Sequence, residues 1–501
     1  MNNPQPDLAK LLQPMFGNAP DRPAIRHNDI WYDWGWVQAV MRGVTEALNE
    51  AGIPTDRPVA VIARNRPSSG ANLLALLAAG RSISMIYALQ SAGGMAADLR
   101  AIRPAALIAD VQDWNDELLT AAREVGCLGL KLEDQAAAVV TIVTPRDPAR
   151  SASHHEPFAV PGIELLTSGT TGKPKRQLIS ATLIARAMIL ESTIYRNADS
   201  RGTELPHPMI LPFPFGNISG LYTFLPMAVA AIPILMLEKF DIDVWIDCVK
   251  KYRPKSMSLP PAGMHQLLER NLPKEDLASL AFLASGATRI DPAQIDQILE
   301  RYGLPILSSY GATEFGGPVT NMTYEMHQQF GSAKRFSVGR PWAGAELRVV
   351  DEDDFTPLPA GKAGLLEVMA PRIGTHWIRT TDLGLIDEDG FIYILGRADG
   401  AISRGGFKIV PDVVVDALLL HPAVGQAAVV GLPDPRLGQI PVAAVVLKAG
   451  ASVSEEELKA HARAQLYTTH VPARFKIVDA LPLTVSLKVS LPAVAALFDA
   501  V

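Results

Sequence analysis

Residues 167–175 are the most informative stretch of this chain and read Thr167-Ser168-Gly169-Thr170-Thr171-Gly172-Lys173-Pro174-Lys175. They follow the short, mostly apolar run of residues 162–166. The apolar run predicts a β-strand. The stretch after it is rich in glycine, which lets backbone N–H groups turn toward an anion, and in hydroxyl and lysine side chains, which add hydrogen-bond donors and positive charge. This composition predicts a loop that holds a polyphosphate, and a flexible polar surface loop is the alternative.

The stretch differs from the common nucleotide-binding loop. That loop has four residues between its first glycine and the Gly-Lys-Ser/Thr sequence. Here Gly169 and Gly172 are only three positions apart, and Pro174 follows the first lysine. Proline at this position disfavours the helix whose N-terminus would hold a phosphate in the common design.

The order of residues resembles the phosphate loop of the adenylate-forming superfamily, which includes acyl-CoA and aryl-CoA synthetases, luciferases and adenylation domains of peptide synthetases. Two departures are visible: Arg176 stands where the family usually has glycine, and Ser180-Ala181 stand near the usual place of a histidine. By this resemblance the loop supplies the following ATP-binding residues: Thr167, Ser168, Gly169, Thr170, Thr171, Gly172, Lys173 and Lys175.

Length and composition set the limits of the other expectations. A chain of 501 residues predicts about three domain-sized units. The net charge of −6 gives the surface no general reason to bind nucleic acid or anionic membranes. Cys127 and Cys248 lie far apart in the sequence, which favours neither a disulfide framework nor a metal site. We therefore expect a reducing, cytoplasmic location, and residues 1–14 lack the pattern of a signal peptide.

Residues 209–237 contain no charged side chain and are long enough to span a bilayer. Four prolines and two glycines interrupt them, so we expect a strand, a pocket-lining loop, a helix and a second strand, and no integral membrane segment. In the family, an aromatic-rich segment at this place lines the acyl pocket. The apolar side chains of this segment favour an acid with an apolar or aromatic tail, and Asn217 favours a polar substituent on it; plain core packing is the alternative. The implied pocket residues are Phe213, Phe215, Asn217, Ile218 and Gly220.

The N-terminal part alternates between two kinds of element. Strands are expected at residues 59–62, 83–86 and 106–109, and helices at 33–51 and 69–79. Such alternation predicts a parallel sheet with helices on both faces.

The segment Ser308-Ser309-Tyr310-Gly311-Ala312-Thr313-Glu314 is a second match to the family, placed after a strand expected at residues 305–307. The carboxyl ends of strands are where α/β proteins bind ligands. The resemblance implies that Tyr310 stacks on adenine, Thr313 contacts the α-phosphate and Glu314 helps to hold Mg²⁺. Further adenine-site residues implied in the same way are Gly286, Ala287, Ser309 and Gly311. A helix cap is the alternative for the Thr-Glu pair.

Residues 377–384 and 396–406 are the third and fourth matches. The resemblance implies that Asp382 accepts hydrogen bonds from the ribose hydroxyls and that Arg397 contacts ribose or phosphate. Thr381 replaces the usual glycine, and a turn aspartate before a strand at residues 383–386 is the alternative for Asp382. Asp399 matches the family's hinge, which predicts an adenylation domain over residues 1–398 and a mobile cap over residues 399–501.

The cap is expected to be a small α+β domain, with helices at residues 411–420 and 454–466 and strands at 424–432 and 441–447. Gly405 and Gly406 match the channel through which CoA ligases pass pantetheine, and Phe407 stands where a small polar or acidic residue is usual. Lys488 ends the last match and is implied to be the catalytic lysine of the mobile cap. Leu487 takes the place of the usual glycine before it.

Together these segments predict an α/β protein with a large N-terminal domain of parallel and mixed sheets with helices, a β-barrel-like subdomain, and a small mobile α+β C-terminal domain. The resemblance implies an AMP-forming acid–thiol ligase that uses ATP, Mg²⁺ and CoA to convert a carboxylic acid, through an acyl-adenylate, into a thioester. An amine or a carrier-protein thiol as acceptor is one alternative. A nucleotide-binding homologue without turnover is another. A homodimer is the commonest closed assembly and a possible state. The sequence leaves the acid and the acceptor open.

Overall fold

The computed structural model describes residues 6–88, 90–151, 157–167, 175–192, 207–286, 290, 292–342, 344–398, 400–404, 407–434, 437–484 and 488–498. The chain divides into two compact units. Unit 1 contains Met1–Gly263, Leu272–Leu283 and Gly311–Pro318, and unit 2 contains Met264–Asn271, Ala284–Tyr310 and Val319–Val501. The domain boundary expected at residue 399 lies within unit 2 and stays a prediction.

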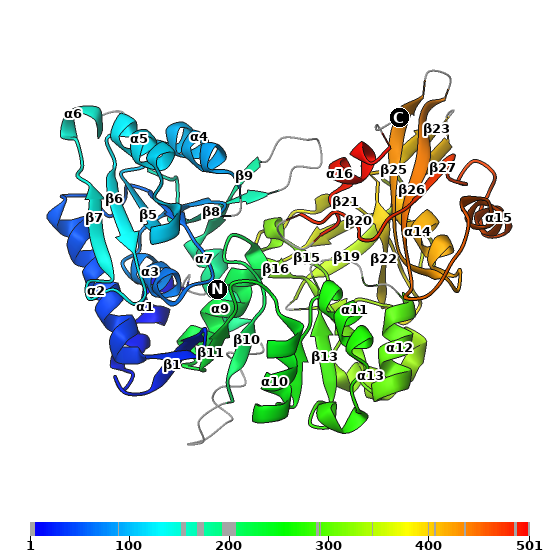
Figure 1. The fold of residues 1–501 in the computed structure, drawn as a ribbon, viewed down its shortest axis with the longest axis horizontal. Coiled ribbons are helices and arrows are strands. Elements are labelled where there is room, and N and C mark those ends of the chain that lie inside the picture. Colours follow the sequence, from blue (N-terminus) through cyan, green and yellow to red (C-terminus); the bar gives the residue numbers. More distant parts are fainter. Residues whose placement is uncertain are drawn as a thin grey trace. The chain divides into compact units, whose positions relative to one another are not determined.

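A seven-stranded sheet with the order β7-β6-β5-β3-β4-β8-β9 forms the centre of unit 1 (Figure 1). Its strands are β3 (Val59–Ile62), β4 (Ile83–Ile86), β5 (Ala106–Asp110), β6 (Leu128–Leu132), β7 (Val140–Thr144), β8 (Gly162–Thr167) and β9 (Lys175–Ser180). The five inner strands are parallel, and β7 and β9 are antiparallel at the edges. Ile62 pairs with both Ile86 and Ala109, so β3, β4 and β5 end at the same edge of the sheet.

Helices cover both faces of this sheet because β3, β4 and β5 are buried along their whole length. α4 (Ala92–Ile102) and α5 (Asp116–Val125) pack against alternate strand residues such as Ala60 and Leu107. α2 (Trp34–Glu50) and α3 (Pro67–Ala78) lie on the opposite face (Figure 1). The expected parallel sheet between two layers of helices is confirmed.

A second sheet of unit 1 has the order β10-β11-β1-β2. It contains β10 (Met209–Leu211), β11 (Ile234–Met236), β1 (Pro23–His27) and β2 (Ile30–Asp33), and α9 (Ile218–Val229) connects β10 to β11. The strand, loop, helix and strand expected over residues 209–237 are therefore confirmed. Within the described ranges, the structure has no helix that is both long and apolar enough to cross a membrane.

The sequence predicts an α-helix after the phosphate loop, at residues 182–195, and the structure differs from this prediction. A single α-turn, α7 (Ala181–Leu183), passes into a π-helix, η3 (Ile184–Leu190). The Glu191 N–H donates to the carbonyl of Arg186, five residues back. Five of the seven side chains of η3 are buried, and this wider turn is a known variation inside α-helices that periodicity alone does not reveal.

Unit 1 contains further helices and strands in addition to these two sheets and their helices. They are α1 (Leu8–Leu12), η1 (Gln13–Gly17), η2 (Val111–Asp113), α6 (Pro148–Ser151), α10 (Ile242–Tyr252), β12 (Ser256–Ser258), η5 (Lys274–Leu277), β15 (Gly311–Ala312), η6 (Thr313–Phe315) and β16 (Gly317–Pro318). α11 (Pro261–Arg270) and β13 (Phe282–Ser285) have residues in both units.

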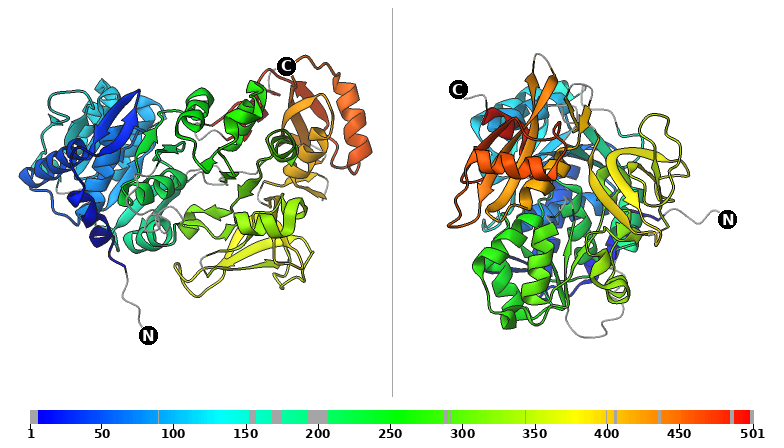
Figure 2. Two further views of the ribbon diagram at one scale, coloured as in Figure 1. Left: turned by 90° about the horizontal axis from the view of Figure 1, so that it is seen from below. Right: turned by 90° about the vertical axis from the view of Figure 1, so that its right-hand side faces the viewer.

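Unit 2 contains a four-stranded antiparallel sheet, drawn in yellow in Figure 2. Its strands, in spatial order, are β19 (Glu346–Val350), β20 (Gly364–Met369), β21 (Ile378–Ile386) and β22 (Ile392–Arg397). Before it come α12 (Pro292–Tyr302), β14 (Ile306–Ser308), β17 (Thr320–Asn321), α13 (Tyr324–Phe330), η7 (Gly331–Lys334) and β18 (Arg340–Pro341). The sequence predicts β-rich elements at residues 338–341 and 364–368, and β18 and β20 lie at these positions.

The last sheet is built on two long strands, β25 (Val424–Asp434) and β26 (Gly438–Leu447), with β23 (Ile402–Arg404), β24 (Phe407–Ile409) and β27 (Arg474–Ile477) beside them. Alternate residues face opposite layers. Val429 and Ala443 pack with α14 (Pro411–Leu419) and α15 (Glu455–Gln465), whereas Val430 and Val442 pack toward α16 (Leu491–Ala496). The expected α+β character of the C-terminal region is confirmed.

Candidate active site

The expected phosphate loop connects two paired strands of unit 1. β8 and β9 are antiparallel partners over their full length, and Thr167 pairs with Lys175. A strand, not a helix, therefore follows the loop, as Pro174 predicted. Residues 168–174 lie outside the described residues, as do the side chains of Thr167 and Lys175. Their roles in binding ATP stay predictions.

Arg176, which replaces the usual glycine of the family, has a structural explanation. Its guanidinium lies 3.2 Å from a carboxylate oxygen of Glu164 and 3.6 Å from Asp98, and it donates to the carbonyl of Met85. These contacts join β9 to β8, α4 and the end of β4. Arg176 therefore holds β9, the strand that follows the phosphate loop, against its neighbours. It lies outside residues 167–175 and adds no side chain to the loop itself.

Thr313 and Glu314 lie in the 3₁₀ turn η6, between the paired strands β15 and β16. The turn begins after Ala312 without a side-chain cap, so the helix-cap alternative for the Thr-Glu pair is wrong. Thr313 is half-buried and Glu314 is exposed. One exposed carboxylate is a donor set that suits Mg²⁺, because this ion combines one or two carboxylates with water and phosphate oxygens.

Two segments of the expected adenine site lie side by side in unit 2. The Ser309 N–H donates to the Ser285 carbonyl at 3.2 Å. A Cβ atom on Gly286 would lie 3.0 Å from the Ser309 hydroxyl, so a larger residue here would require the serine side chain to shift slightly. Gly311 follows at the start of β15. Ala287 lies outside the described residues.

Tyr310 and Asp382 are brought together although they are 72 residues apart. The Tyr310 hydroxyl donates to Asp382 Oδ2 at 2.5 Å, and only 9% of the tyrosine is exposed. Its backbone is fixed as well, because its N–H donates to Thr320 Oγ1 and its carbonyl accepts from Val319. Burial, followed by the negative charge of Asp382, raises the pKa of Tyr310 far above its ordinary value. The phenol therefore stays a donor to the carboxylate.

Asp382 lies inside β21, so the alternative of a turn aspartate before a strand is wrong. The strand starts five residues earlier than the apolar run indicated, because its first half, which pairs with β20, alternates between half-buried and exposed positions. Asp382 is the cross-strand partner of Arg397 on β22. Arg397 donates through Nη2 to Thr381 Oγ1 at 2.5 Å. The threonine that departs from the family is thus a hydrogen-bond acceptor for the arginine.

Lys488 sits on a tight loop that precedes α16. Its N–H donates to the Thr484 hydroxyl at 3.2 Å, its carbonyl accepts from the Thr484 N–H at 2.6 Å, and Leu483 and Val489 form a β-bridge. Crowding by protein atoms, and then the nearby charge of Arg397, lowers the pKa of the Lys488 amine, and Asp382 opposes this shift. Lys488 as a whole residue is exposed, and its amine is within electrostatic range of the two residues that the sequence assigns to the nucleotide. We call Tyr310, Asp382, Arg397 and Lys488 the nucleotide group.

The loop between β10 and α9 and the first turn of α9 contain the expected acid-pocket residues, and we call residues 213–220 the acid segment. Phe213, Asn217 and Ile218 are half-buried. Phe215 is fully buried and packs edge-to-face on Phe224, with ring centroids 4.8 Å apart, as the core-packing alternative predicted. A Cβ on Gly220 would lie 2.1 Å from the Pro214 carbonyl oxygen, so this position needs glycine.

Sequence reasoning missed the residues that hold the acid segment. Asn65 is 5% exposed, and its side chain makes hydrogen bonds with Phe213, Phe215 and Leu237. The available signal was the sequence Arg64-Asn65-Arg66, which follows a buried strand at the carboxyl edge of a parallel sheet.

The expected hinge and CoA channel are only partly described. Asp399, Gly405 and Gly406 lie outside the described residues, and of Phe407 only the backbone, paired with Arg404 across β23 and β24, is described. Their roles stay predictions.

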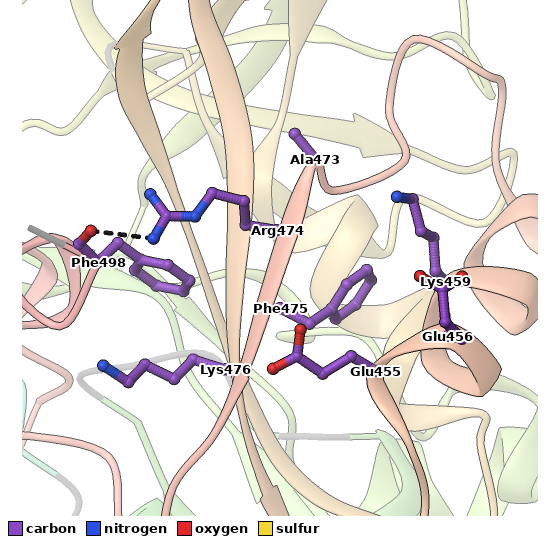
Figure 3. A pocket seen from close by; sticks show the side chains of 8 residues that line it. All are labelled: Glu455, Glu456, Lys459, Ala473, Arg474, Phe475, Lys476 and Phe498. Atoms are coloured by element: carbon purple, nitrogen blue, oxygen red, sulfur yellow. Dashed lines mark hydrogen bonds between the residues drawn. The ribbon is translucent and has the colours of Figure 1, made fainter. Parts of the chain in front are cut away.

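An open pocket near the end of the chain lies between α15 and β27 (Figure 3). Glu455, Glu456 and Lys459 line one side. On the other, Arg474 donates to the carbonyl of Phe498 at 3.1 Å, and Lys476 donates to the carbonyl of Leu497 at 2.6 Å. Both cations therefore hold the chain just after α16, the helix that follows the Lys488 loop.

The chain matches two family models. Residues 15–374 match the model described as AMP-binding enzyme, and residues 416–488 match the AMP-binding enzyme C-terminal domain. Among curated proteins, the sulfoacetate–CoA ligase of Cupriavidus necator is 28% identical, over 95% of this chain and 94% of that protein.

Solved structures agree on the fold. ATP-bound MatB from Rhodopseudomonas palustris superimposes with a TM-score of 0.81 at 23% identity, over 98% of this chain and 99% of that one. The amide bond synthetase McbA from Marinactinospora thermotolerans gives a TM-score of 0.78 at 25% identity, over 98% and 99% of the two chains.

Proposed function

The chain belongs to the family of AMP-binding enzymes, within the adenylate-forming superfamily, and from this we propose that it activates a carboxylic acid with ATP and transfers the acyl group to CoA. In the first step the substrate carboxylate attacks the α-phosphorus of ATP, and pyrophosphate leaves. In the second step the CoA thiol attacks the acyl-adenylate carbonyl, and AMP leaves. The products are acyl-CoA or aryl-CoA, AMP and pyrophosphate.

The observation that carries this proposal is the nucleotide group. Tyr310 bonds to Asp382, Asp382 pairs with Arg397 across two strands, and Lys488 lies within their electrostatic range. These residues come from motifs that are up to 178 positions apart (488 − 310). A homologue without turnover has no need to keep a lysine, an arginine and a carboxylate close together.

The proposed roles follow from charge. Asp382 accepts from the ribose hydroxyls, and Tyr310 covers the adenine. Lys488 neutralises the charge that develops between the carboxylate and the α-phosphate, and residues 167–175 hold the β- and γ-phosphates. Mg²⁺, bound through Glu314, would supply further positive charge to the phosphates. Positioning and charge stabilisation are the main means by which proteins accelerate such transfers.

An amine as acceptor is the second candidate. It is favoured by the similarity to the amide bond synthetase McbA and by Phe407, which stands in the expected CoA channel. In this version the acyl-adenylate forms in the same way, and a neutral amine replaces the thiol as the nucleophile.

The test is a panel of carboxylic acids, scored for pyrophosphate and AMP release with and without CoA, and for product mass. CoA ligation predicts acid-dependent pyrophosphate release without CoA, and an acyl-CoA product when CoA is added. Acid-dependent release of pyrophosphate, followed by an amide product that forms only when an amine is added and by no thioester, would favour the amide synthetase. ATP binding without acid-dependent release from any acid would contradict both.

Two finer expectations accompany this proposal. We propose that the protein works in the cytoplasm and that it can form a homodimer. Light scattering of the purified chain tests the second, and a mass of one chain, 53.9 kDa, would contradict it.

A further inference from the structure

Three consecutive residues after β3 reach three different parts of unit 1. Arg64 binds Asp113, just after β5, and the carbonyl of Ala88, just after β4. Asn65 reaches the acid segment and the end of β11. Arg66 lies 3.0 Å from Glu238, which follows β11. We call residues 64–66 the clamp.

Asn65 uses every polar atom of its side chain on the backbone of other segments. Nδ2 donates to the carbonyl oxygens of Phe213 and Leu237, each at 3.0 Å, and Oδ1 accepts from the Phe215 N–H at 3.1 Å. The side chain is almost completely buried, so water cannot replace these bonds at low cost. Two of the three bonds hold the backbone on both sides of Pro214.

Arg64 holds the backbone next to Asn65 in position through its own side-chain contacts. Its Nε donates to Asp113 Oδ2 at 2.9 Å and its Nη2 donates to Asp113 Oδ1 at 2.5 Å, and the Asp113 side chain is 1% exposed. A planar guanidinium that binds a carboxylate through two contacts is a geometrically specific pair. Its contact with Ala88 adds the end of β4. The clamp is therefore anchored at the shared carboxyl edge of β3, β4 and β5.

The acid segment has little freedom to move away from the clamp. Tyr87, which directly follows β4, packs on Gly216 so closely that a Cβ there would lie 2.7 Å from its ring. Gly220 touches the Pro214 carbonyl in the same way. The acid segment is thus restricted by Tyr87 at the edge of the sheet and by the close contact between its own residues Gly220 and Pro214.

We propose that Asn65 is a positioning residue that sets the shape of the acid pocket, and so the affinity and selectivity for the carboxylic acid. This inference rests on the proposed function and on the acid-pocket role that the family resemblance implies for the acid segment. Asn65 itself touches no substrate. It determines where the backbone of residues 213–215 lies, and therefore where the half-buried side chains of Phe213 and Asn217 project.

The test compares Asn65→Ala and the nearly isosteric Asn65→Asp with wild type. Both variants lose the two bonds that Nδ2 donates, so both should raise the KM for the acid by about tenfold or more, the expected consequence of losing buried hydrogen bonds. The KM for ATP should stay within about twofold. The ratio of kcat/KM between the best acid and its nearest homologue in the panel should fall.

Asn72→Ala is the matched control. Asn72 is a completely buried asparagine in α3, and neither of its side-chain polar atoms makes a hydrogen bond in the structure. Its substitution should leave the KM for the acid unchanged. Melting temperatures of all variants report any general loss of stability.

A purely structural role gives a different result. Asn65→Ala would then lower the melting temperature while the KM for the acid and the selectivity ratio stay as in wild type, and this would overturn the proposal. Equal changes in the KM values for acid and ATP would also overturn it. Should both variants fail to fold, hydrogen exchange on wild type decides: a Phe215 amide that exchanges as fast as an exposed loop amide contradicts the clamp. Failure of the proposed function is visible separately, because wild type itself would then release no pyrophosphate.

Discussion

The acid segment and the nucleotide group are held in opposite ways. The acid segment is fixed through its backbone, by a buried asparagine and by glycine contacts that leave no space for a side chain. The nucleotide group depends on charged side chains, and two of its four members, Arg397 and Lys488, are exposed. Exposed charges add little to stability and cost little to move. The acid segment is therefore fixed by the folded interior, whereas the charged groups for which we propose a role on ATP include exposed side chains that cost little to move.

Lys488→Ala should give the largest effect and tests the second half of this comparison. Loss of one preorganised positive group typically costs on the order of 10²–10³ in rate, so adenylation from the free acid should fall by at least that factor. Thioester formation from pre-made acyl-adenylate should persist. Because Lys488 is exposed, the melting temperature should change little.

Lys459→Ala is the control for this variant, since Lys459 lies on α15 at the pocket of Figure 3 and has no proposed role in catalysis. Equal loss of both half-reactions in Lys488→Ala would contradict the assignment of the lysine to the first step.

Gly216→Ala should have the next largest effect and tests the first half of the comparison. The added Cβ would lie 2.7 and 2.9 Å from two ring carbons of Tyr87, so the segment or the ring must shift. Overpacking of this kind costs about 1–3 kcal/mol, and we expect the KM for the acid to rise roughly tenfold with a lower melting temperature. Steady-state kinetics with varied acid at saturating ATP measures this.

A second substitution shows whether the ring contact is the cause. Tyr87→Leu removes the ring, so Gly216→Ala made in that background should change the KM for the acid much less than it does alone. Additive effects of the two substitutions would show that Gly216 acts through something other than Tyr87.

Much of the fold was predictable because its signals are local. The bounds of β3 and β4 were predicted correctly from short apolar runs. The sequence also predicts a capping box, since Ser454 is followed three residues later by Glu457, and this box is present at α15. The π-helix η3 was missed, since it has the apolar composition of any buried helix. The full length of β21 was missed because its first half alternates between half-buried and exposed positions.

The sequence named the residues of the nucleotide group but not their contacts, and their roles in binding ATP stay predictions. The family motifs placed Tyr310, Asp382, Arg397 and Lys488 in order along the chain, but no local pattern reports the bond between Tyr310 and Asp382 or the acceptor role of Thr381. Asn65 was missed for the same reason, since its partners lie about 150 residues away. Such contacts depend on tertiary packing, which sequence periodicity does not encode.

The Tyr310–Asp382 contact predicts a pH effect on stability that is smaller than the kinetic effects. The folded state raises the pKa of Tyr310 above its ordinary value of 10.0, so the folded protein keeps a proton that the unfolded chain loses above that pH. Stability should therefore be unaffected by this group below about pH 10 and should decrease above it, by up to about 1.4 kcal/mol per pH unit.

Tyr310→Phe separates the pH dependence of stability due to Tyr310 from that of other buried phenols and thiols. The melting temperature of wild type should fall more steeply above pH 10 than that of the variant, when both are measured in the same buffers. Parallel curves would show that Tyr310 ionises as easily in the folded state as in the unfolded chain.

Thr381→Val should give the smallest effect, and it distinguishes a structural from a functional use of the residue that departs from the family. The valine keeps the shape and removes the hydroxyl that accepts from Arg397. Because Arg397 is exposed, water can replace the lost acceptor, and the cost should be about 0.5–1 kcal/mol, or a two- to fivefold rise in the KM for ATP. Thr381→Ser should behave as wild type. An unchanged KM in Thr381→Val would mean that Arg397 reaches the nucleotide without help from this contact, and the nucleotide group would then depend on charge alone.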